Sequence, residues 1–221
     1  MTTSPHITTV VTNTGQIDPA NARMGPDSGL PVDIPDAFIT DVLKPYRSHA
    51  KYLKSARIVH LADKTSLKAK DAAFMVGAGR FAIPESCYID DTGHFNAVEF
   101  NICYNQLAYV LFARGLELGV LQKLNAGLQK LSDKQVDNLS ISMAEYKKHQ
   151  LPSMLIVSID GVRFFKQLKS GDFEGELSIN RVAPVGGAWF FFTTVTFSDA
   201  EGVKAKGSVV LAYVPPGVHV P

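Results

Sequence analysis

The sequence predicts an α+β fold in which a curved antiparallel sheet wraps around one long, buried helix. The segment Asn96–Leu124 has a helix-forming composition without proline, and between Ala97 and Ala113 apolar side chains fall on nearly every face. A helix that is apolar all round must be buried. Four strand-like segments follow it and are joined by short turns, which favours antiparallel pairing of consecutive strands in a meander.

The other elements follow in chain order and complete a hot-dog arrangement, in which the sheet encloses the helix. Residues 1–35 lack a sustained hydrophobic period, so we expect a flexible N-terminal arm before a folded domain that spans residues 36–221. Apolar runs between polar turns predict the strands. The domain begins with a short helix, Asp36–Leu43, and the predicted strands are Ser55–Asp63, Ala72–Ile83, Leu151–Phe165, Gly171–Ala183, Ala188–Ser198 and Gly202–Val214.

A second apolar stripe follows the central helix. Leucines recur at three- and four-residue spacing in a helix predicted over Leu116–Leu131. Such a stripe is typical of packing against the core, and a subunit interface is the alternative interpretation. The leucines concerned are Leu121, Leu124, Leu128 and Leu131.

The composition narrows the classes of function. The 221 residues carry a formal net charge of +1, whereas nucleic-acid-binding domains are usually strongly basic. The sequence contains no apolar run of the length that a membrane span needs, and its N-terminus lacks the pattern of a secretory signal. Cys87 and Cys103 are too few for a disulfide framework or a four-cysteine zinc site. We expect a cytoplasmic protein without a metal or other cofactor.

Two familiar motifs lack the structural context that they need. The run Gly77–Ala82 fits a dinucleotide-binding fingerprint, but Pro84 prevents the helix whose N-terminus would hold a pyrophosphate. The triplet Asp91-Thr92-Gly93 matches that of aspartic proteases, but it occurs once and is followed by His94 instead of a small residue. Neither motif therefore predicts a function.

The junction between the second strand and the central helix concentrates residues suited to catalysis. The first turn of a helix offers free backbone N–H groups and a partial positive charge, which can stabilise the oxyanion formed when a carbonyl is attacked. Tyr88 can donate a hydrogen bond to the same oxygen, and Asn96 can orient a nucleophile or bind the carbonyl. His94 is of the residue type suited to proton transfer near neutrality, and Gly93 permits a tight turn. We predict Tyr88, His94 and Asn96 as catalytic residues and Gly93 as a substrate-binding residue.

Each of these side chains also has a purely structural interpretation. Asn96 and Glu99 have the spacing of a helix-capping box, which by itself explains both residues. Tyr88 fits an aromatic residue at a strand end, and His94 fits an exposed loop. The hydrophobic pattern does not decide between the structural and the catalytic roles.

Three runs of the sequence carry a resemblance to a known family. They are Glu85–Glu99, whose shared residues are Glu-Ser-x-Tyr-Ile-x-x-Thr-Gly-His-Phe-Asn-Ala-Val-Glu, then Asn105–Tyr109 and His149–Ile156. The chain resembles the FcoT-like fatty-acyl thioesterases, which are actinobacterial hot-dog enzymes, over about residues 34–213. The similarity is dense in the central helix and looser in the later strands.

The resemblance implies a fatty-acyl or enoyl thioester of acyl carrier protein or coenzyme A as substrate. It also implies a site that contains Tyr88 and Asn96 and that Tyr46 lines as a third tyrosine, in an oligomer that is at least dimeric. Some relatives, from β-amino-acid and isonitrile natural-product pathways, add glycine to an enoyl thioester, and release of the product by hydrolysis can follow. This sequence departs from the family in its N-terminal arm and in a longer link over Leu116–Lys148.

The same residues suit two reactions. In thioester hydrolysis His94 would take a proton from water, and in glycine addition it would deprotonate the glycine ammonium before the amine attacks the β-carbon, giving an N-carboxymethyl-3-amino acid. Tyr88 or the N-terminus of the central helix would hold the oxyanion in both reactions. The glycine carboxylate would need backbone N–H groups, a hydroxyl such as that of Ser153, or a basic side chain. A non-catalytic acyl-binding protein and an enoyl-thioester hydratase are the alternatives, the hydratase being weakened by the absence of an Asp/His dyad pattern.

Basic residues cluster in one part of the sequence. Between Lys44 and Lys70 eight basic residues and one acid give a local charge of +7 inside a chain of net charge +1. A solvated face is one interpretation. The functional one is a docking surface for an acidic carrier protein or for the phosphates of coenzyme A. The basic residues are Lys44, Arg47, Lys51, Lys54, Arg57, Lys64, Lys68 and Lys70.

Overall fold

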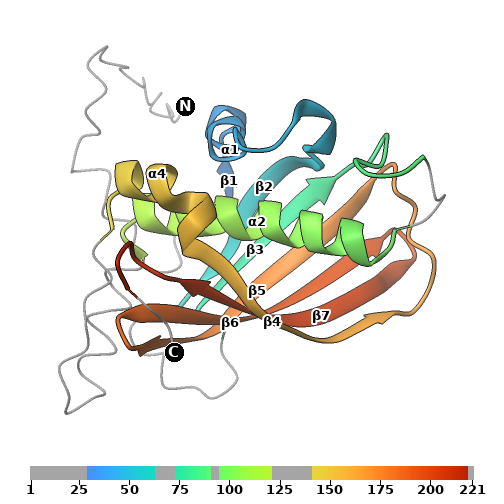
Figure 1. The fold of residues 1–221 in the computed structure, drawn as a ribbon. Helices are drawn as coiled ribbons and strands as arrows, with labels where there is room; N and C mark the ends of the chain where they lie inside the picture. Colours follow the sequence, from blue (N-terminus) through green and yellow to red (C-terminus); the bar gives the residue numbers. More distant parts are fainter. Residues whose placement is uncertain (1–28, 63–72, 91–94, 121–140, 219–221) are drawn as a thin grey trace, which may run out of the picture.

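The computed structural model describes residues 29–62, 73–90, 95–120 and 141–218, which form the predicted α+β hot-dog arrangement (Figure 1). One antiparallel sheet curves around the long helix α2 (Ala97–Glu117), with strand order β1-β2-β3-β5-β6-β7-β4. The strands are β1 Val32–Ile34, β2 Leu53–Leu61, β3 Met75–Phe81, β4 Met154–Phe164, β5 Phe173–Val185, β6 Ala188–Asp199 and β7 Gly202–Tyr213.

Glycines on β3 allow α2 to pack closely on the sheet. A Cβ atom at Gly77 would lie 2.2 Å from Cδ2 of Leu111, and one at Gly79 would lie 3.1 Å from Cδ1 of Leu107. Both leucines belong to α2 and are completely buried. Any larger residue at these two positions would push the helix off the sheet, because the interior has no spare volume.

Two shorter helices flank α2 on the side away from the sheet (Figure 1). They are α1 (Asp36–Val42) and α4 (Met143–Ser153). The buried hydroxyl of Tyr146 on α4 donates to the backbone carbonyl of Tyr109 on α2, and Lys147 forms an ion pair with Asp41 on α1. Among the described residues, no helix is long and apolar enough to cross a membrane.

The structure corrects three predicted boundaries. Residues 32–34 form β1 on the edge of the sheet, so they are part of the fold although the sequence analysis assigned them to the N-terminal arm. Helix α2 ends at Glu117, where a turn at Leu118 and Gly119 interrupts it. The leucines of the second apolar stripe lie outside the described residues.

The third correction concerns the segment before β4. Helix α4 was not predicted, and residues 151–153 form its last turn instead of the start of a strand. Its start carries a complete capping box, in which Ser142 and Glu145 satisfy each other's backbone N–H groups. That pattern is a local signal of a helix start.

The predicted four-strand meander is wrong at its first step. Strands β5, β6 and β7 are joined by tight turns and pair in sequence order. β4 instead lies on the far edge, beside β7, in a register that pairs Met154 with Tyr213. The segment 165–172 between β4 and β5 is long enough to carry the chain across, whereas the two later turns permit only a hairpin.

Candidate active site

The side chains of Tyr88 and Asn96 meet at the N-terminus of α2, as the candidate site requires. Tyr88 lies in the segment between β3 and α2 and is half exposed. The Nδ2 group of Asn96 donates a hydrogen bond to the Tyr88 hydroxyl oxygen over 2.7 Å. Two residues predicted as catalytic are therefore in direct contact.

The backbone of α2 determines which way the Asn96 amide points. Asn96 is the N-cap residue, and its Oδ1 atom accepts the backbone N–H of Val98 at 2.8 Å. Because a backbone N–H can only donate, the amide oxygen must face the helix and the NH₂ group must face Tyr88. Tyr88 accepts that hydrogen bond, so its own hydroxyl proton remains available for another acceptor. Capping and site geometry thus use opposite ends of one side chain.

Glu99 stabilises the cap from inside the protein. Its side chain is only 3% exposed, and one carboxylate oxygen accepts the backbone N–H of Asn96 at 3.3 Å. The other oxygen accepts the hydroxyl of Ser86 at 3.0 Å. Glu99 therefore completes the capping box and also ties the segment that carries Tyr88 to the first turn of α2.

A second tie to this segment comes from a tyrosine that the sequence analysis did not identify. The buried Tyr52 hydroxyl accepts the backbone N–H of Cys87 at 2.8 Å, one residue before Tyr88. Burial raises the pKa of Tyr52, so this phenol stays neutral. Nothing in the local sequence indicates the contact, because 35 residues separate its partners.

Gln106 fixes Tyr52 to the helix. Its Oε1 atom accepts the backbone N–H groups of Tyr52 and Leu53, each at 2.9 Å, and its Nε2 atom donates to the carbonyl of Ala50 at 2.6 Å. The Gln106 side chain is completely buried. One amide on α2 therefore satisfies three backbone groups where the chain enters β2.

The inner wall of the site is aromatic. The ring of Phe95, one residue before the cap, lies 5.2 Å from that of Phe173 and 5.0 Å from that of Phe197, measured between centroids. The rings of Phe100 and Phe164 complete the cluster at 6.4 and 6.3 Å from Phe95. The Tyr88–Asn96 pair thus stands at the boundary between solvent and a dense apolar interior.

Tyr46 lies farther along the helix. Its ring centroid is 6.4 Å from that of Tyr109, and burial is the main cause of its raised pKa, with Tyr109 and Cys103 contributing. The buried Cys103 thiol likewise has a pKa well above its usual value because of burial, which favours a structural role. Tyr46 therefore packs against the middle of α2, away from its N-terminus.

The remaining predicted residues are His94, Gly93 and Ser153. His94 and Gly93 lie outside the described residues. Ser153 ends α4 and is almost completely buried, and its carbonyl accepts the N–H of Val214. It immediately precedes β4, and the opposite end of that strand lies about 30 Å away at the rise of an extended strand. Phe164, at that opposite end, packs against Phe95. Within one chain, Ser153 is far from Tyr88.

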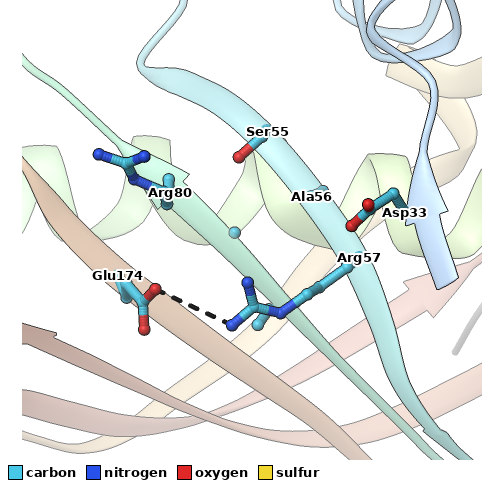
Figure 2. Close-up of a pocket in the computed structure, with 8 residues that line it drawn as sticks. Asp33, Ser55, Ala56, Arg57, Arg80 and Glu174 are labelled. Atoms are coloured by element: carbon cyan, nitrogen blue, oxygen red, sulfur yellow. Dashed lines mark ion pairs between the residues drawn. The ribbon is translucent and has the colours of Figure 1, made fainter. Parts of the chain in front are cut away.

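A hollow on the other face of the sheet is unrelated to this group. Figure 2 shows it in front of the strands, with a helix behind them. Arg57 and Glu174 form a loose ion pair of 3.9 Å across it. Its acidic and basic side chains offset each other, and no predicted catalytic residue contributes. It is lined by Asp33, Ser55, Ala56, Arg57, Ala78, Gly79, Arg80 and Glu174.

Comparison with known proteins adds the family context. A family profile that describes the FcoT-like thioesterase domain matches residues 41–213. A protein of Streptomyces coeruleorubidus named (2E)-enoyl-ACP glycyltransferase is 36% identical over 81% of this chain and 96% of its own length. A Mycobacterium marinum protein of the same name is 31% identical over 91% of this chain and 97% of its own length.

Comparison with solved structures finds, among others, a putative thioesterase from Shewanella oneidensis. It is 8% identical and covers 82% of this chain and 100% of its own, with a TM-score of 0.39.

Proposed function

The chain belongs to the FcoT-like thioesterase family, and from this premise we propose that it adds glycine to a (2E)-enoyl thioester carried by an acyl carrier protein. Two relatives that match most of this chain carry the name of that activity. The observation in this protein that carries the proposal is the direction of the hydrogen bond from Asn96 to Tyr88.

That direction provides what conjugate addition needs at the thioester carbonyl. The glycine amine forms a bond to the β-carbon, and the electrons of the carbon–carbon double bond move to the carbonyl oxygen to give an enolate. Because Asn96 already donates to Tyr88, the Tyr88 proton is free to bond that oxygen. A donor aimed at developing negative charge is the main source of rate enhancement at such sites.

The proton balance assigns a base. Glycine reacts as the neutral amine, so its ammonium loses one proton before attack, and the addition product gains one proton at the α-carbon. We propose His94 for this transfer, since an imidazole exchanges protons near neutral pH. His94 stands in the sequence two residues before Asn96.

The proposal gives Tyr46 a role in binding the acyl chain but gives no role to the Ser153 side chain of the same chain. Tyr46, against the middle of α2, would line the path of the acyl chain beyond the reacting carbonyl. Ser153 stands at the opposite end of β4 from the site, so within one chain its hydroxyl does not reach the glycine carboxylate.

Hydrolysis is the second reaction that we propose, and the thioesterase family supports it. Water would attack the same carbonyl, the carbon–sulfur bond would break and the carrier thiol would leave with a proton. Tyr88 would bond the tetrahedral oxyanion as it bonds the enolate. Hydrolysis after addition would release the N-carboxymethyl-3-amino acid.

We also infer a dimer. Strand β4 is an edge of the sheet, and its exposed side chains include Leu155, Val157 and Ile159. An apolar edge strand without a partner is a site for pairing with another chain. Light scattering on the purified protein should give twice the mass of one chain, and a monomer at the concentrations used for assay would contradict the inference.

Mass spectrometry of the reaction products tests the proposed function. A short (2E)-enoyl group, loaded on a carrier protein or on coenzyme A, is incubated with and without glycine. The expected product is heavier by one glycine and is absent with Tyr88→Phe. Free enoic acid, formed equally without glycine, would make the protein a plain thioesterase. Binding of the acyl group without any product would indicate a non-catalytic protein.

A further inference from the structure

Three basic residues near the start of β2 differ from the other described cations of the basic segment. Lys44 pairs with Asp41, and Arg57 pairs with Glu174. In contrast, Arg47 and Lys51 form no ion pair among the described residues, and Lys54 donates only to the Lys51 carbonyl. We call Arg47, Lys51 and Lys54 the 47–54 patch. Its positive charge is not neutralised by neighbouring side chains in the described part of the chain.

The backbone beneath this patch is held firmly. Gln106 on α2 bonds the backbone of Ala50, Tyr52 and Leu53, all within the span of the patch. The side chains of Arg47 and Lys54 are exposed, whereas Tyr52 between them is completely buried. The patch therefore presents its charges from a fixed position, with little further ordering of the backbone needed on binding.

The same contacts join the patch to the candidate active site. The Tyr52 hydroxyl accepts the backbone N–H of Cys87, which precedes Tyr88. Leu53 at the start of β2 pairs with Phe81 at the end of β3. The patch before β2 and the segment after β3 therefore lie at the same end of these two strands. A partner bound at the patch would be next to the segment that carries Tyr88.

We propose that the 47–54 patch docks an acidic face of the acyl carrier protein that delivers the enoyl group. This inference rests on the proposed function and names the surface that the partner uses. Cations that are not paired with acidic side chains, on a firmly held surface, are complementary to a charged protein face, which they attract over a distance before contact. None of the three lines the hollow that Arg57 and Glu174 span on the other face of the sheet.

Binding of the carrier protein tests the inference separately from catalysis. A fluorescently labelled holo acyl carrier protein is titrated with the wild type and with the double variant Arg47→Glu/Lys51→Glu, at ionic strengths of about 10 and about 150 mM. Lys148→Glu is the matched control, because Lys148 is an exposed cation on α4 that does not belong to the patch. Lys54 is left unchanged because it bonds the backbone.

We expect the double variant to raise the dissociation constant by about tenfold or more at low salt, with a smaller loss at high salt. Lys148→Glu should bind like the wild type. Unchanged binding by the double variant, an equal loss with Lys148→Glu, or no binding by the wild type would each overturn the inference. The milder Arg47→Ala/Lys51→Ala variant is the control for folding. A loss of binding in this variant at an unchanged melting temperature is not due to unfolding.

Reaction with a carrier-free substrate separates this inference from the proposed function. The rate with an enoyl-pantetheine thioester and glycine should be the same for the double variant and the wild type. No glycine adduct with either protein would contradict the proposed function and leave the binding result standing. If the double variant lost activity with enoyl-coenzyme A but not with the enoyl carrier protein, the patch would be assigned to the phosphates of coenzyme A, and the inference would be overturned.

Discussion

The Asn96 side chain joins the end of a helix to a candidate catalytic hydroxyl. Its Oδ1 atom caps α2 by accepting the Val98 N–H group, and its Nδ2 atom donates to Tyr88 over 2.7 Å. The helix thereby determines the direction of the hydrogen bond at the site. The capping and catalytic interpretations of Asn96 are therefore compatible, since each uses a different atom.

Replacing Tyr88 by phenylalanine should reduce turnover without affecting the fold. The variant loses one oxyanion donor, which typically costs about 10²–10³-fold in kcat. The half-exposed ring itself is retained, so the melting temperature should stay within about 1 °C of the wild type. Steady-state kinetics with an enoyl thioester and glycine measure the first effect. A kcat equal to that of the wild type would remove Tyr88 from the mechanism.

Asn96→Asp separates capping from catalysis. An aspartate is an equally good N-cap and its charge suits the helix N-terminus, so thermal stability should be preserved. Its carboxylate has no proton to donate and would instead accept the Tyr88 hydroxyl proton, which turns that proton away from the substrate. We expect kcat to fall by about as much as in Tyr88→Phe. An active variant of normal stability would contradict the assigned direction of the bond.

Gln106 should be important for stability. Gln106→Leu keeps the side-chain volume but leaves three backbone groups without their partner: the buried N–H groups of Tyr52 and Leu53 and the part-buried carbonyl of Ala50. At about 1 kcal/mol or more for each group, the free energy of unfolding should fall by about 3 kcal/mol. Urea denaturation measures this loss. Asn105→Ala, at the neighbouring and partly exposed position, should change it by less than about 0.5 kcal/mol.

The close approach of β3 and α2 predicts that Gly77 does not tolerate a side chain. In Gly77→Ala the new methyl group would overlap with Leu111, which is completely buried and has no room to move. Overpacking of this kind typically costs about 1–3 kcal/mol. Gly171→Ala is the control, since no atom lies within 4 Å of its added Cβ. Equal denaturation midpoints for the two variants would contradict the packing described here.

The ion pair between α1 and α4 predicts a pH-dependent contribution to stability. Hydrogen bonds from Lys147 and then Lys44 hold the pKa of Asp41 below its usual value. A carboxyl group with a lowered pKa stabilises the folded state above the unfolded pKa, about 3.9, and loses that contribution as the pH falls through the folded value. Lys147→Met should therefore lower the melting temperature at pH 7 by about 1–3 °C. The difference should vanish near pH 2, and a constant difference would contradict this origin.

Family similarity and local patterns were sufficient to single out the segment in which Tyr88 and Asn96 meet. The residues around Tyr88 and Asn96 form one continuous segment, and the capping box of Asn96 with Glu99 depends on a three-residue spacing. Tyr52 and Gln106 could not be identified in this way, because their contacts join positions 35 to 54 residues apart. Ser153 was chosen for its hydroxyl group, and the sequence alone did not show that it ends α4, at the opposite end of β4 from Phe164.

The sequence by itself determined the elements whose signals are local. Those elements are the buried helix α2, its cap at Asn96, and the hairpins that link β5, β6 and β7. Only the tertiary structure decided that β4 pairs with β7 and that β1 joins the sheet at Val32. Capping and periodicity act within a few residues, whereas the choice of strand partner depends on which distant edges remain free when the sheet closes around α2.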